Sequence, residues 1–374
     1  MTVKESFVEH KKPSVSQKPW VETPLRESYA LSQAAGCRIF LKLENLQPSG
    51  SFKSRGIGHY IVRRLEEIPA SSRNQTPHIF SSSGGNAGLA AVTASRSLGF
   101  PCTVVVPLST KPMMITKLKA AGAHDVIQHG PTWADADAYL RKEVMLKAGS
   151  AAIYAPPFDH PDIWTGHSTA MHEIAAQMPD SSPPDVVICS VGGGGLFNGI
   201  CQAIDDLAMN DSTTVLAVET EGAASLHAAV QAGELVTLPA ITTQATSLGA
   251  VRVTGRSLEY ALRPNVKTVV LPDAEAAMGC WRLADDERLM VEMACGVNVA
   301  LCYDGRLEHA LGRRVKPDDK IVVVLCGGSN VTVEMLQKWR EEFGWVEGKR
   351  NDSIHVKGRN GYVPSDITAP NGQH

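Results

Sequence analysis

One lysine of this chain stands where a turn rich in glycine and serine passes into a helix-like run. Lys53 lies within "PSGSFKSRG" (48–56), next to an aromatic residue. An amine in such a setting can form a Schiff base with an aldehyde, while the nearby glycines let the backbone approach an anion. Taken alone, the stretch is more typical of a solvated surface lysine. The interpretation of Lys53 as a nucleophile depends on the sites described next.

Four consecutive glycines follow a strand-like apolar run. They are Gly192, Gly193, Gly194 and Gly195, and they come directly after "DVVICSV" (185–191). Backbone N–H groups in such a turn can converge on one point, and the start of a helix adds partial positive charge, so the segment predicts a phosphate-binding loop. It lacks the Gly-Lys-Ser/Thr of a P-loop and matches the dinucleotide-binding fingerprint only loosely. A flexible tight turn is the alternative, although four adjacent glycines are costly in conformational entropy.

Two further strand ends carry polar residues. "SSSGGNAG" (81–88) offers hydroxyls, close backbone approach and an asparagine at a helix start, which would suit a carboxylate ligand. An ordinary helix N-cap is an equally good interpretation of that stretch. "CGGSN" (326–330) places the thiol of Cys326 at the end of a strand. Taken alone, this cysteine is more typical of a small buried apolar residue.

The elements that must position these residues follow an alternating order. Short β-branched runs alternate with longer helix-like runs, which is typical of βαβ units and a mostly parallel sheet. The predicted strands are 38–44, 78–83, 102–107, 124–130, 151–156, 185–191, 214–220, 268–272 and 320–328. The predicted helices are 86–98, 111–121, 133–148, 166–178, 195–208 and 331–343. Ligands of open α/β sheets bind at the carboxyl ends of strands, so the glycine-containing junctions predict one composite pocket.

Bulk composition bounds the class of protein. A length of 374 residues suggests about two domains, and 43% apolar with 20% charged residues is ordinary for a globular protein. A net charge of −3 gives no basic footprint for nucleic acid or a membrane surface. The eight cysteines show no C-x-x-C spacing and are predicted to be reduced thiols. We therefore expect a cytoplasmic protein without a signal peptide.

Five motifs, in order and spacing, resemble those of the fold type II pyridoxal-phosphate enzymes. They are "QPSGSFKSRG", "SSSGGNAG", "PPFDHPDIWTGH", "SVGGGGL" and "CGGSN". Within that group the chain is most similar to the L-serine dehydratases of the serine/threonine ammonia-lyase family, from about Thr23 to Gly344. The resemblance implies a tryptophan synthase β-like α/β fold with two open, twisted, mostly parallel-sheet domains. The implied large cofactor-binding domain spans 1–45 and 151–345, the small substrate-loop domain spans 46–150, and a mobile polar tail spans 346–374.

The resemblance also implies roles for individual residues. Lys53 forms the Schiff base with pyridoxal 5′-phosphate (PLP) and later moves the Cα proton, and Ser83 lies near the reacting centre. The other implied cofactor contacts are Phe52 at the ring, Asn86 at the 3′-oxygen, Gly192, Gly193, Gly194 and Gly195 at the 5′-phosphate, and Cys326 at the pyridine nitrogen. The loop implied to receive the substrate carboxylate comprises Ser82, Ser83, Gly84, Gly85 and Asn86.

The implied reaction is β-elimination and deamination of L-serine to pyruvate and ammonia, with weaker activity on L-threonine giving 2-oxobutanoate. A neutral thiol at Cys326 favours a protonated ring nitrogen less than a carboxylate would, which agrees with elimination rather than racemisation or transamination. The alternatives are L-threonine as the main substrate, β-replacement as in cysteine synthases and, least favoured, a non-catalytic phosphate-binding module. The expected partner is a small amino acid, with no nucleic acid and no membrane, and the chain is expected to form a homodimer.

A monovalent cation site, for K⁺, is implied in the same way. "AVETEGAASLHAA" (217–229) and "TSLGAVRVTG" (246–255) resemble the segments that hold the cation in this family. The implied ligands are the carboxylate of Glu219 and the carbonyls of Ala223, Leu248 and Ala250. Hard oxygen ligands suit potassium. From the residues alone, Glu219 is equally typical of a surface acid at the end of a strand.

Two positions depart from the family pattern. Gly84 stands where the family carries alanine, which is expected to loosen the substrate loop and lower turnover. Met293 in "VEMACG" (291–296) stands where proline is expected. The preceding residue, Glu292, is expected near the site, with no role assigned to it.

Overall fold

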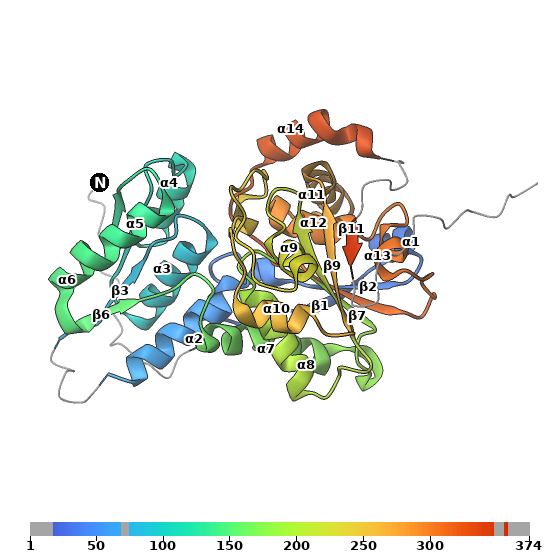
Figure 1. Ribbon diagram of the computed structural model, residues 1–374, viewed down its shortest axis with the longest axis horizontal. Coiled ribbons are helices and arrows are strands. Elements are labelled where there is room, and N and C mark those ends of the chain that lie inside the picture. Colours follow the sequence, from blue (N-terminus) through green and yellow to red (C-terminus); the bar gives the residue numbers. More distant parts are fainter. Residues whose placement is uncertain (1–17, 69–74, 348–354, 358–374) are drawn as a thin grey trace, which may run out of the picture. The chain divides into compact units, whose positions relative to one another are not determined.

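The computed structural model describes residues 18–68, 75–347 and 355–357 (Figure 1). The chain divides into two compact units, one of Met1–Glu22 with Gln47–His167 and one of Thr23–Leu46 with Ser168–His374. Each unit is built on its own mostly parallel sheet, as the alternation of strands and helices predicts. The domain boundaries predicted at residues 46, 150 and 346 stay a prediction.

The first unit contains a four-stranded sheet in the order β5–β4–β3–β6, in which every pairing is parallel. The strands are β3 (His78–Ser81), β4 (Cys102–Val106), β5 (Asp125–Gln128) and β6 (Ala152–Tyr154). The helices are α2 (Lys53–Glu66), α3 (Asn86–Leu98), α4 (Pro112–Ala120), α5 (Trp133–Tyr139), the π-helix η3 (Leu140–Val144), α6 (Met145–Ala148), the 3₁₀ helix η4 (Gly149–Ala151) and the start of α7 (Pro161–Gln177). Nearly all of α3 is buried, because its alanine-rich sequence has no polar face to turn toward water.

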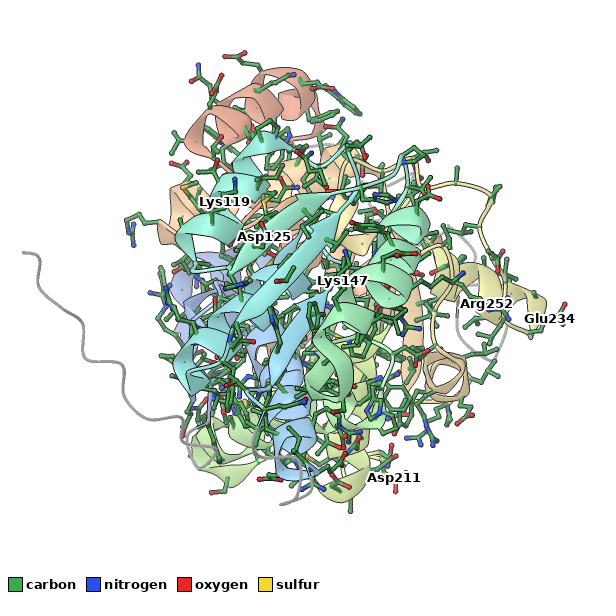
Figure 2. The ribbon with its side chains drawn as sticks, turned by 90° about the vertical axis from the view of Figure 1, so that its left-hand side faces the viewer. Lys119, Asp125, Lys147, Asp211, Glu234 and Arg252 are labelled. Atoms are coloured by element: carbon green, nitrogen blue, oxygen red, sulfur yellow. The ribbon has the colours of Figure 1, made fainter. Side chains whose placement is uncertain are left out.

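Strand β5 forms one edge of this sheet and carries polar residues where another strand could pair. Asp125 and Gln128, at its two ends, are exposed. Figure 2 labels Asp125 together with Lys119 of α4 and Lys147 of α6, which are exposed on the same unit. A charged residue on an edge strand opposes pairing with a foreign strand, and Asp125 is such a residue in β5.

The second unit contains a seven-stranded sheet in the order β1–β2–β10–β7–β8–β9–β11. Its strands are β1 (Leu25–Ser28), β2 (Arg38–Lys42), β7 (Val186–Ser190), β8 (Thr214–Thr220), β9 (Val266–Leu271), β10 (Lys320–Val324) and β11 (His355–Lys357). The outer strands β1 and β11 pair antiparallel, and the others pair in parallel. β7 and β10 lie inside the sheet and are buried along almost their whole length, as expected of parallel strands covered on both faces.

The α-helices of the second unit are α1 (Tyr29–Ala35), the remainder of α7, α8 (Gly195–Asp206), α9 (Ser225–Ala232), α10 (Gly255–Ala261), α11 (Asp273–Glu287), α12 (Met293–Ala300), α13 (Arg306–Leu311) and α14 (Val333–Phe343). Short 3₁₀ helices are η1 (Glu44–Leu46), η5 (Pro179–Ser181), η6 (Thr246–Leu248) and η7 (Gly344–Val346). Helices α11 and α12 pack backbone to backbone. A Cβ atom at Gly279 would lie 2.1 Å from the carbonyl oxygen of Gly296, so this contact requires glycine.

Every predicted strand has a counterpart in the structure, and the predicted helices match to within a few residues at most ends. The helix predicted at 166–178 begins earlier, at Pro161, because proline suits the first turn of a helix. The predicted run at 133–148 is divided by a π-helical turn at Leu140–Val144. Most of the tail predicted at 346–374 lies outside the described residues, but His355–Lys357 belong to the sheet as β11. Among the described helices, none has the length and apolar composition needed to cross a bilayer.

Candidate active site

Lys53 is the first residue of α2, in the first unit. Its Nζ donates a hydrogen bond of 2.6 Å to the carbonyl oxygen of Pro157. The same nitrogen lies 5.2 Å from the ring centroid of Phe52 and 6.0 Å from that of Phe158. The motif "PPFDHPDIWTGH" thus supplies both the carbonyl and one of the two rings that surround the amine.

A buried histidine supports this region. His167 is fully buried, and its ring lies 4.9 Å from that of Phe52. A Cβ atom at Gly56 would lie 2.4 Å from the His167 ring, so only glycine allows α2 to pass so close to it. Burial, followed by the nearby charges of Lys53 and Arg55, holds the pKa of His167 well below its usual range. His167 is therefore a neutral packing partner of Phe52.

The loop after β3 has a defined internal structure. The hydroxyl oxygen of Ser83 accepts a hydrogen bond of 3.3 Å from the N–H of Gly85, which tightens the turn before α3. Asn86 begins α3 and is buried. A Cβ atom at Gly84 would lie 2.8 Å from Cγ2 of Thr110. Glycine at this position is therefore fitted to its neighbour, which gives a local packing reason for the departure noted in the sequence.

Ser82, in the same loop, forms a hydrogen bond with a residue of strand β6. The Ser82 hydroxyl lies 3.3 Å from the hydroxyl of Tyr154, the last residue of β6. Tyr154 in turn donates a 2.6 Å hydrogen bond to Oδ1 of Asp137 in α5. Of the predicted site residues in the first unit, Lys53 and Asn86 begin α2 and α3, and Ser82–Gly85 lie in the turn that leads into α3.

In the second unit, the glycine run joins β7 to α8. Gly194 has φ +98° and is the N-cap of α8, and a Cβ atom there would lie 1.9 Å from Oγ of Ser257. The Ser257 hydroxyl donates to Oδ1 of Asn198, whose amide donates to Oγ1 of Thr254, each over 2.8 Å. Thr254 also donates its N–H to the carbonyl oxygen of Gly193 over 3.3 Å. This network fixes a turn whose N–H groups lie at the start of a twelve-residue helix, where an anion binds well.

Cys326 follows β10 and is buried. Its Sγ lies 3.5 Å from the hydroxyl of Ser190, at the carboxyl end of the neighbouring β7, and donates to the carbonyl oxygen of Ala294 over 3.8 Å. Burial, followed by the hydrogen bond to Cys326, raises the pKa of Cys295 well above its usual range.

Glu292 holds the loop that carries Cys326. It is the N-cap residue of α12, it is buried, and its Oε2 accepts a 3.2 Å hydrogen bond from the N–H of Asn330. A Cβ atom at Gly328, which has φ +118°, would lie 2.0 Å from Cδ of Glu292. The Glu292 side chain can therefore occupy this place only because residue 328 is glycine.

The predicted cation segment lies next to the glycine run. A Cβ atom at Gly192 would lie 3.2 Å from Cα of Leu248, whose carbonyl oxygen accepts a 2.7 Å bond from the N–H of Ala250. Glu219 is fully buried, and its two oxygens accept 2.8 Å bonds from the N–H groups of Leu226 and His227. Burial raises the pKa of Glu219 to about 8, although both bonds oppose the shift. The interpretation of Glu219 as a surface acid is wrong.

Ala223, the remaining predicted cation ligand, lies in the turn after β8. It is buried, and its N–H donates to the carbonyl oxygen of Thr220 over 3.0 Å. Across the described ranges, no cluster of three or more His, Cys, Asp or Glu side chains is arranged to hold a metal ion.

Comparison with known proteins decides the family. A family model described as pyridoxal-phosphate dependent enzyme matches residues 17–327. The chain belongs to the pyridoxal-phosphate dependent enzyme family. Its fold type II architecture and the resemblance predicted from the five motifs are thereby confirmed.

Similar proteins in this family carry related names. The chain is 43% identical over 325 residues to an L-serine dehydratase of Saccharomyces cerevisiae, which covers 85% of this chain and 96% of that protein. It is 39% identical over 325 residues to the catabolic L-serine/threonine dehydratase of the same species, covering 85% of this chain and 89% of that protein. Among solved structures, a fungal L-serine ammonia-lyase from Rhizomucor miehei matches with a TM-score of 0.79 and 35% identity, over 87% of this chain and all of that one.

The residues of the chain fit the cofactor of the family. The turn at Gly194 has no room for a Cβ atom and offers N–H groups at a helix start, as a phosphate requires. Lys53 offers an amine beside aromatic rings, and Cys326 offers a buried thiol. Lys53 belongs to the first unit, whereas Gly194 and Cys326 belong to the second.

Some supporting residues of this family member were not predicted. They are Ser190 beside Cys326, Tyr154 beside Ser82, and the Thr254, Ser257 and Asn198 network behind the glycine run. Only Ser190 had a usable signal in the sequence, because it ends a strand two residues before Gly192. The others depend on contacts between segments that are far apart in the sequence.

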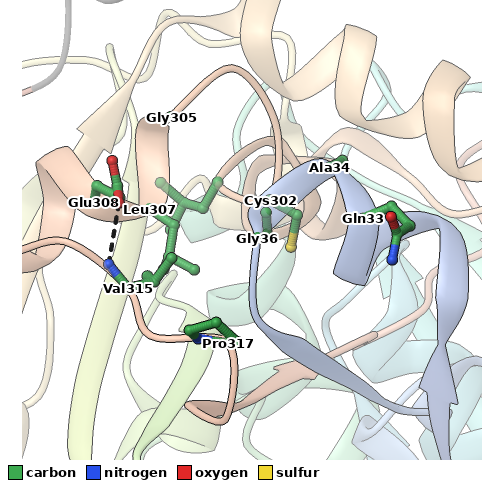
Figure 3. Close-up of a pocket in the computed structure, with 11 residues that line it drawn as sticks. Gln33, Ala34, Gly36, Cys302, Gly305, Leu307, Glu308, Val315 and Pro317 are labelled. Carbon is green, nitrogen blue, oxygen red and sulfur yellow. Dashed lines mark hydrogen bonds between the residues drawn. The ribbon is translucent and has the colours of Figure 1, made fainter. Parts of the chain in front are cut away.

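A separate pocket lies in the second unit (Figure 3), and none of the residues that line it is a predicted site residue. Its volume is about 350 Å³. It lies between the end of α1, the end of α12 and α13, and is lined by residues that include Gln33, Cys302, Leu307 and Glu308. The Glu308 carboxylate accepts a 3.1 Å bond from the N–H of Val315 in the pocket wall. The pocket lies near the amino ends of β2 and β10, whereas open α/β sheets bind ligands at the carboxyl ends.

Proposed function

We propose that this chain is a PLP-dependent lyase that deaminates L-serine to pyruvate and ammonia and acts more weakly on L-threonine, giving 2-oxobutanoate. Family membership supports the cofactor, and the relatives called L-serine dehydratase and L-serine ammonia-lyase support the substrate. The relative called L-serine/threonine dehydratase supports the weaker activity on threonine. The observation that carries the proposal is the setting of Lys53, whose amine is held by the Pro157 carbonyl beside two aromatic rings.

Lys53 has two tasks in this proposal. When bound, PLP supplies an electron sink for the bonds at Cα of an amino acid. The amine of Lys53 would hold the cofactor at its aldehyde carbon, and it would accept the Cα proton of the substrate. The serine hydroxyl leaves with one proton as water, and a second water replaces the nitrogen, which leaves as ammonia. The reaction therefore balances without an oxidant or a reductant.

The other predicted site residues hold the reactants. The run from Gly192 to Gly195 binds the 5′-phosphate through backbone N–H groups. Phe52 would hold the cofactor ring, Asn86 would bind the 3′-oxygen, and Cys326 would supply its thiol to the pyridine nitrogen. The loop of Ser82, Ser83, Gly84, Gly85 and Asn86 binds the amino-acid substrate, with Ser83 nearest the reacting centre.

We propose the cation site as part of the same enzyme. Glu219, Ala223, Leu248 and Ala250 supply the oxygens for K⁺. The burial of Glu219 supports this assignment, because a cation beside its carboxylate would offset the cost of burying a charge. Activity in potassium chloride should exceed activity in lithium chloride of equal ionic strength, and equal rates in both salts would contradict the assignment.

The remaining proposals concern the whole protein. We propose a homodimer, a cytoplasmic location, a large cofactor-binding domain (1–45 and 151–345) and a small substrate-loop domain (46–150). Sedimentation equilibrium tests the dimer, and a fluorescent fusion tests the location. A mass independent of concentration at the value of one 40.1 kDa chain would overturn the dimer.

A product assay tests the function directly. Purified protein reconstituted with PLP is incubated with L-serine and, separately, with L-threonine, and pyruvate and 2-oxobutanoate are measured. We expect both products, with pyruvate formed faster. Faster 2-oxobutanoate would make threonine the main substrate. Formation of cysteine from sulfide and O-acetylserine, without pyruvate from serine, would assign β-replacement instead.

A further inference from the structure

The direction of the hydrogen bond between Ser82 and Tyr154 follows from the other partner of the Tyr154 hydroxyl. Tyr154 ends β6, next to β3, and its hydroxyl contacts both the Ser82 hydroxyl, at 3.3 Å, and Oδ1 of Asp137, at 2.6 Å. A phenol has one proton, whereas a carboxylate can only accept. The short bond to Asp137 therefore takes the Tyr154 proton, and the phenol oxygen is left to accept from Ser82.

Two further observations hold this arrangement in place. Arg141 lies 4.1 Å from the Tyr154 ring centroid, and its Nε lies 3.5 Å from Oδ2 of Asp137, so the other carboxylate oxygen faces a cation. Burial, and next the hydrogen bond to Asp137, raise the pKa of Tyr154 to about 12. The phenol therefore keeps its proton throughout the neutral range, and the direction of both hydrogen bonds is constant there.

This arrangement determines which hydrogen bonds Ser82 can form. Ser82 is 1% exposed and lies in the loop between β3 and α3. Because its proton points to Tyr154, Ser82 can offer only lone pairs to anything else in that loop. A hydroxyl in this state repels a carboxylate oxygen and attracts an N–H or O–H group.

We infer that Tyr154 and Asp137 are positioning residues that make Ser82 a hydrogen-bond acceptor for a donor group of the substrate, its amino or hydroxyl group. This inference rests on the proposed function, and it changes the part that Ser82 plays in it. The substrate carboxylate is then bound by the rest of the loop, through N–H groups and the side chains of Ser83 and Asn86. Selectivity for amino acids that carry a donor at this point follows from the acceptor.

A double-mutant cycle tests whether Tyr154 acts through Ser82. Tyr154→Phe removes the acceptor of the Ser82 proton, and Ser82→Ala removes the hydroxyl. Each single variant should lower kcat/KM for L-serine by about tenfold, the typical worth of one hydrogen bond. The double variant should be no worse than Ser82→Ala. Multiplying losses would overturn the inference, because they would mean that Tyr154 acts independently of Ser82.

Competitive inhibitors test the acceptor role itself. Ethanolamine carries amino and hydroxyl donors without a carboxylate, and propionate carries a carboxylate without donors. Tyr154→Phe should weaken inhibition by ethanolamine about tenfold, the worth of one hydrogen bond, and should leave propionate unchanged or tighter. Weaker inhibition by propionate alone would overturn the inference, since Ser82 would then be a donor to the carboxylate.

A measurement without turnover separates this inference from the proposed function. Tyrosine labelled with ¹³C at Cζ gives seven signals in this chain, and the signal lost in Tyr154→Phe is that of Tyr154. This signal should stay that of a phenol up to pH 11, and in Asp137→Asn it should begin to titrate at lower pH. The same titration midpoint in the unchanged protein and in Asp137→Asn would overturn the network, because the hydrogen bond to Asp137 would then have no effect on the phenol. If the protein shows the network but does not deaminate serine, the proposed function fails instead.

Discussion

Replacing Gly194 by alanine would put a methyl group where the Ser257 hydroxyl lies. The Cβ atom would be 1.9 Å from Oγ and 3.0 Å from Cβ of Ser257, at a backbone φ of +98°. The left-handed conformation costs an alanine about 1 kcal/mol. Relieving the overlap costs about 1–3 kcal/mol more, typical of overpacking, because the serine is held by its bond to Asn198. The turn that we propose for the phosphate would therefore shift.

Gly233 provides a matched control. It has φ +73° and caps α9, and a Cβ atom there would have nothing within 4 Å. Gly233→Ala therefore carries the conformational cost without the overlap. In urea unfolding of the apo-protein, Gly194→Ala should lose about 1–3 kcal/mol more than Gly233→Ala.

The same pair of variants separates stability from cofactor binding. PLP titrated into each apo-protein, followed by its absorbance, should bind at least about tenfold more weakly to Gly194→Ala, because charge-assisted bonds to the phosphate are misaligned. Gly233→Ala should bind PLP as the unchanged protein does. Equal stability and equal PLP affinity in the two variants would refute the reasoning about the glycine turn.

Two other predictions come from the buried contacts. Gly84→Ala should destabilise the protein by about 1–3 kcal/mol through the contact with Thr110. Adding Thr110→Ala should recover part of this loss. If the effects of the two substitutions simply add in thermal unfolding, the contact is not the cause. In buffer free of potassium, Glu219 binds its proton more tightly when folded, since its pKa rises from about 4.5 to about 8, so its contribution to stability is complete below pH 4.5 and is lost as the pH rises to about 8. Glu219→Gln should flatten this part of the stability curve, and an unchanged slope would exclude Glu219 as its source.

The strands next to the site could be predicted because their residues leave little choice. Val186–Ser190 and Lys320–Val324 are short β-branched runs with glycines two or three residues beyond their ends, and both lie inside the sheet. Strand β1 was not predicted because "LRES" is polar and pairs only at the edge. Helix α12 was not predicted because "MACGVNVA" is buried on all sides and so has no helical periodicity.

The places of the candidate site residues along the chain were easier to predict than the residues that contact them. Lys53 and the glycine run could be located from their junctions with helices, which depend on local sequence. The partners of Ser82 and Cys326 depend on which strands are neighbours and on their register, such as Phe80 opposite Tyr154 between β3 and β6. Sequence periodicity carries no information about such pairings, so the direction of the Ser82 hydrogen bond could be derived only from the structure.

Covalent trapping of the cofactor tests the central claim most directly. The purified protein is saturated with PLP, treated with sodium borohydride, digested and analysed by mass spectrometry. Lys53 should carry the reduced pyridoxyl group, and Lys53→Ala should carry none at any lysine. Labelling of a different lysine in the unchanged protein, or no labelling at saturating PLP, would contradict the assignment of Lys53 and the reaction built on it.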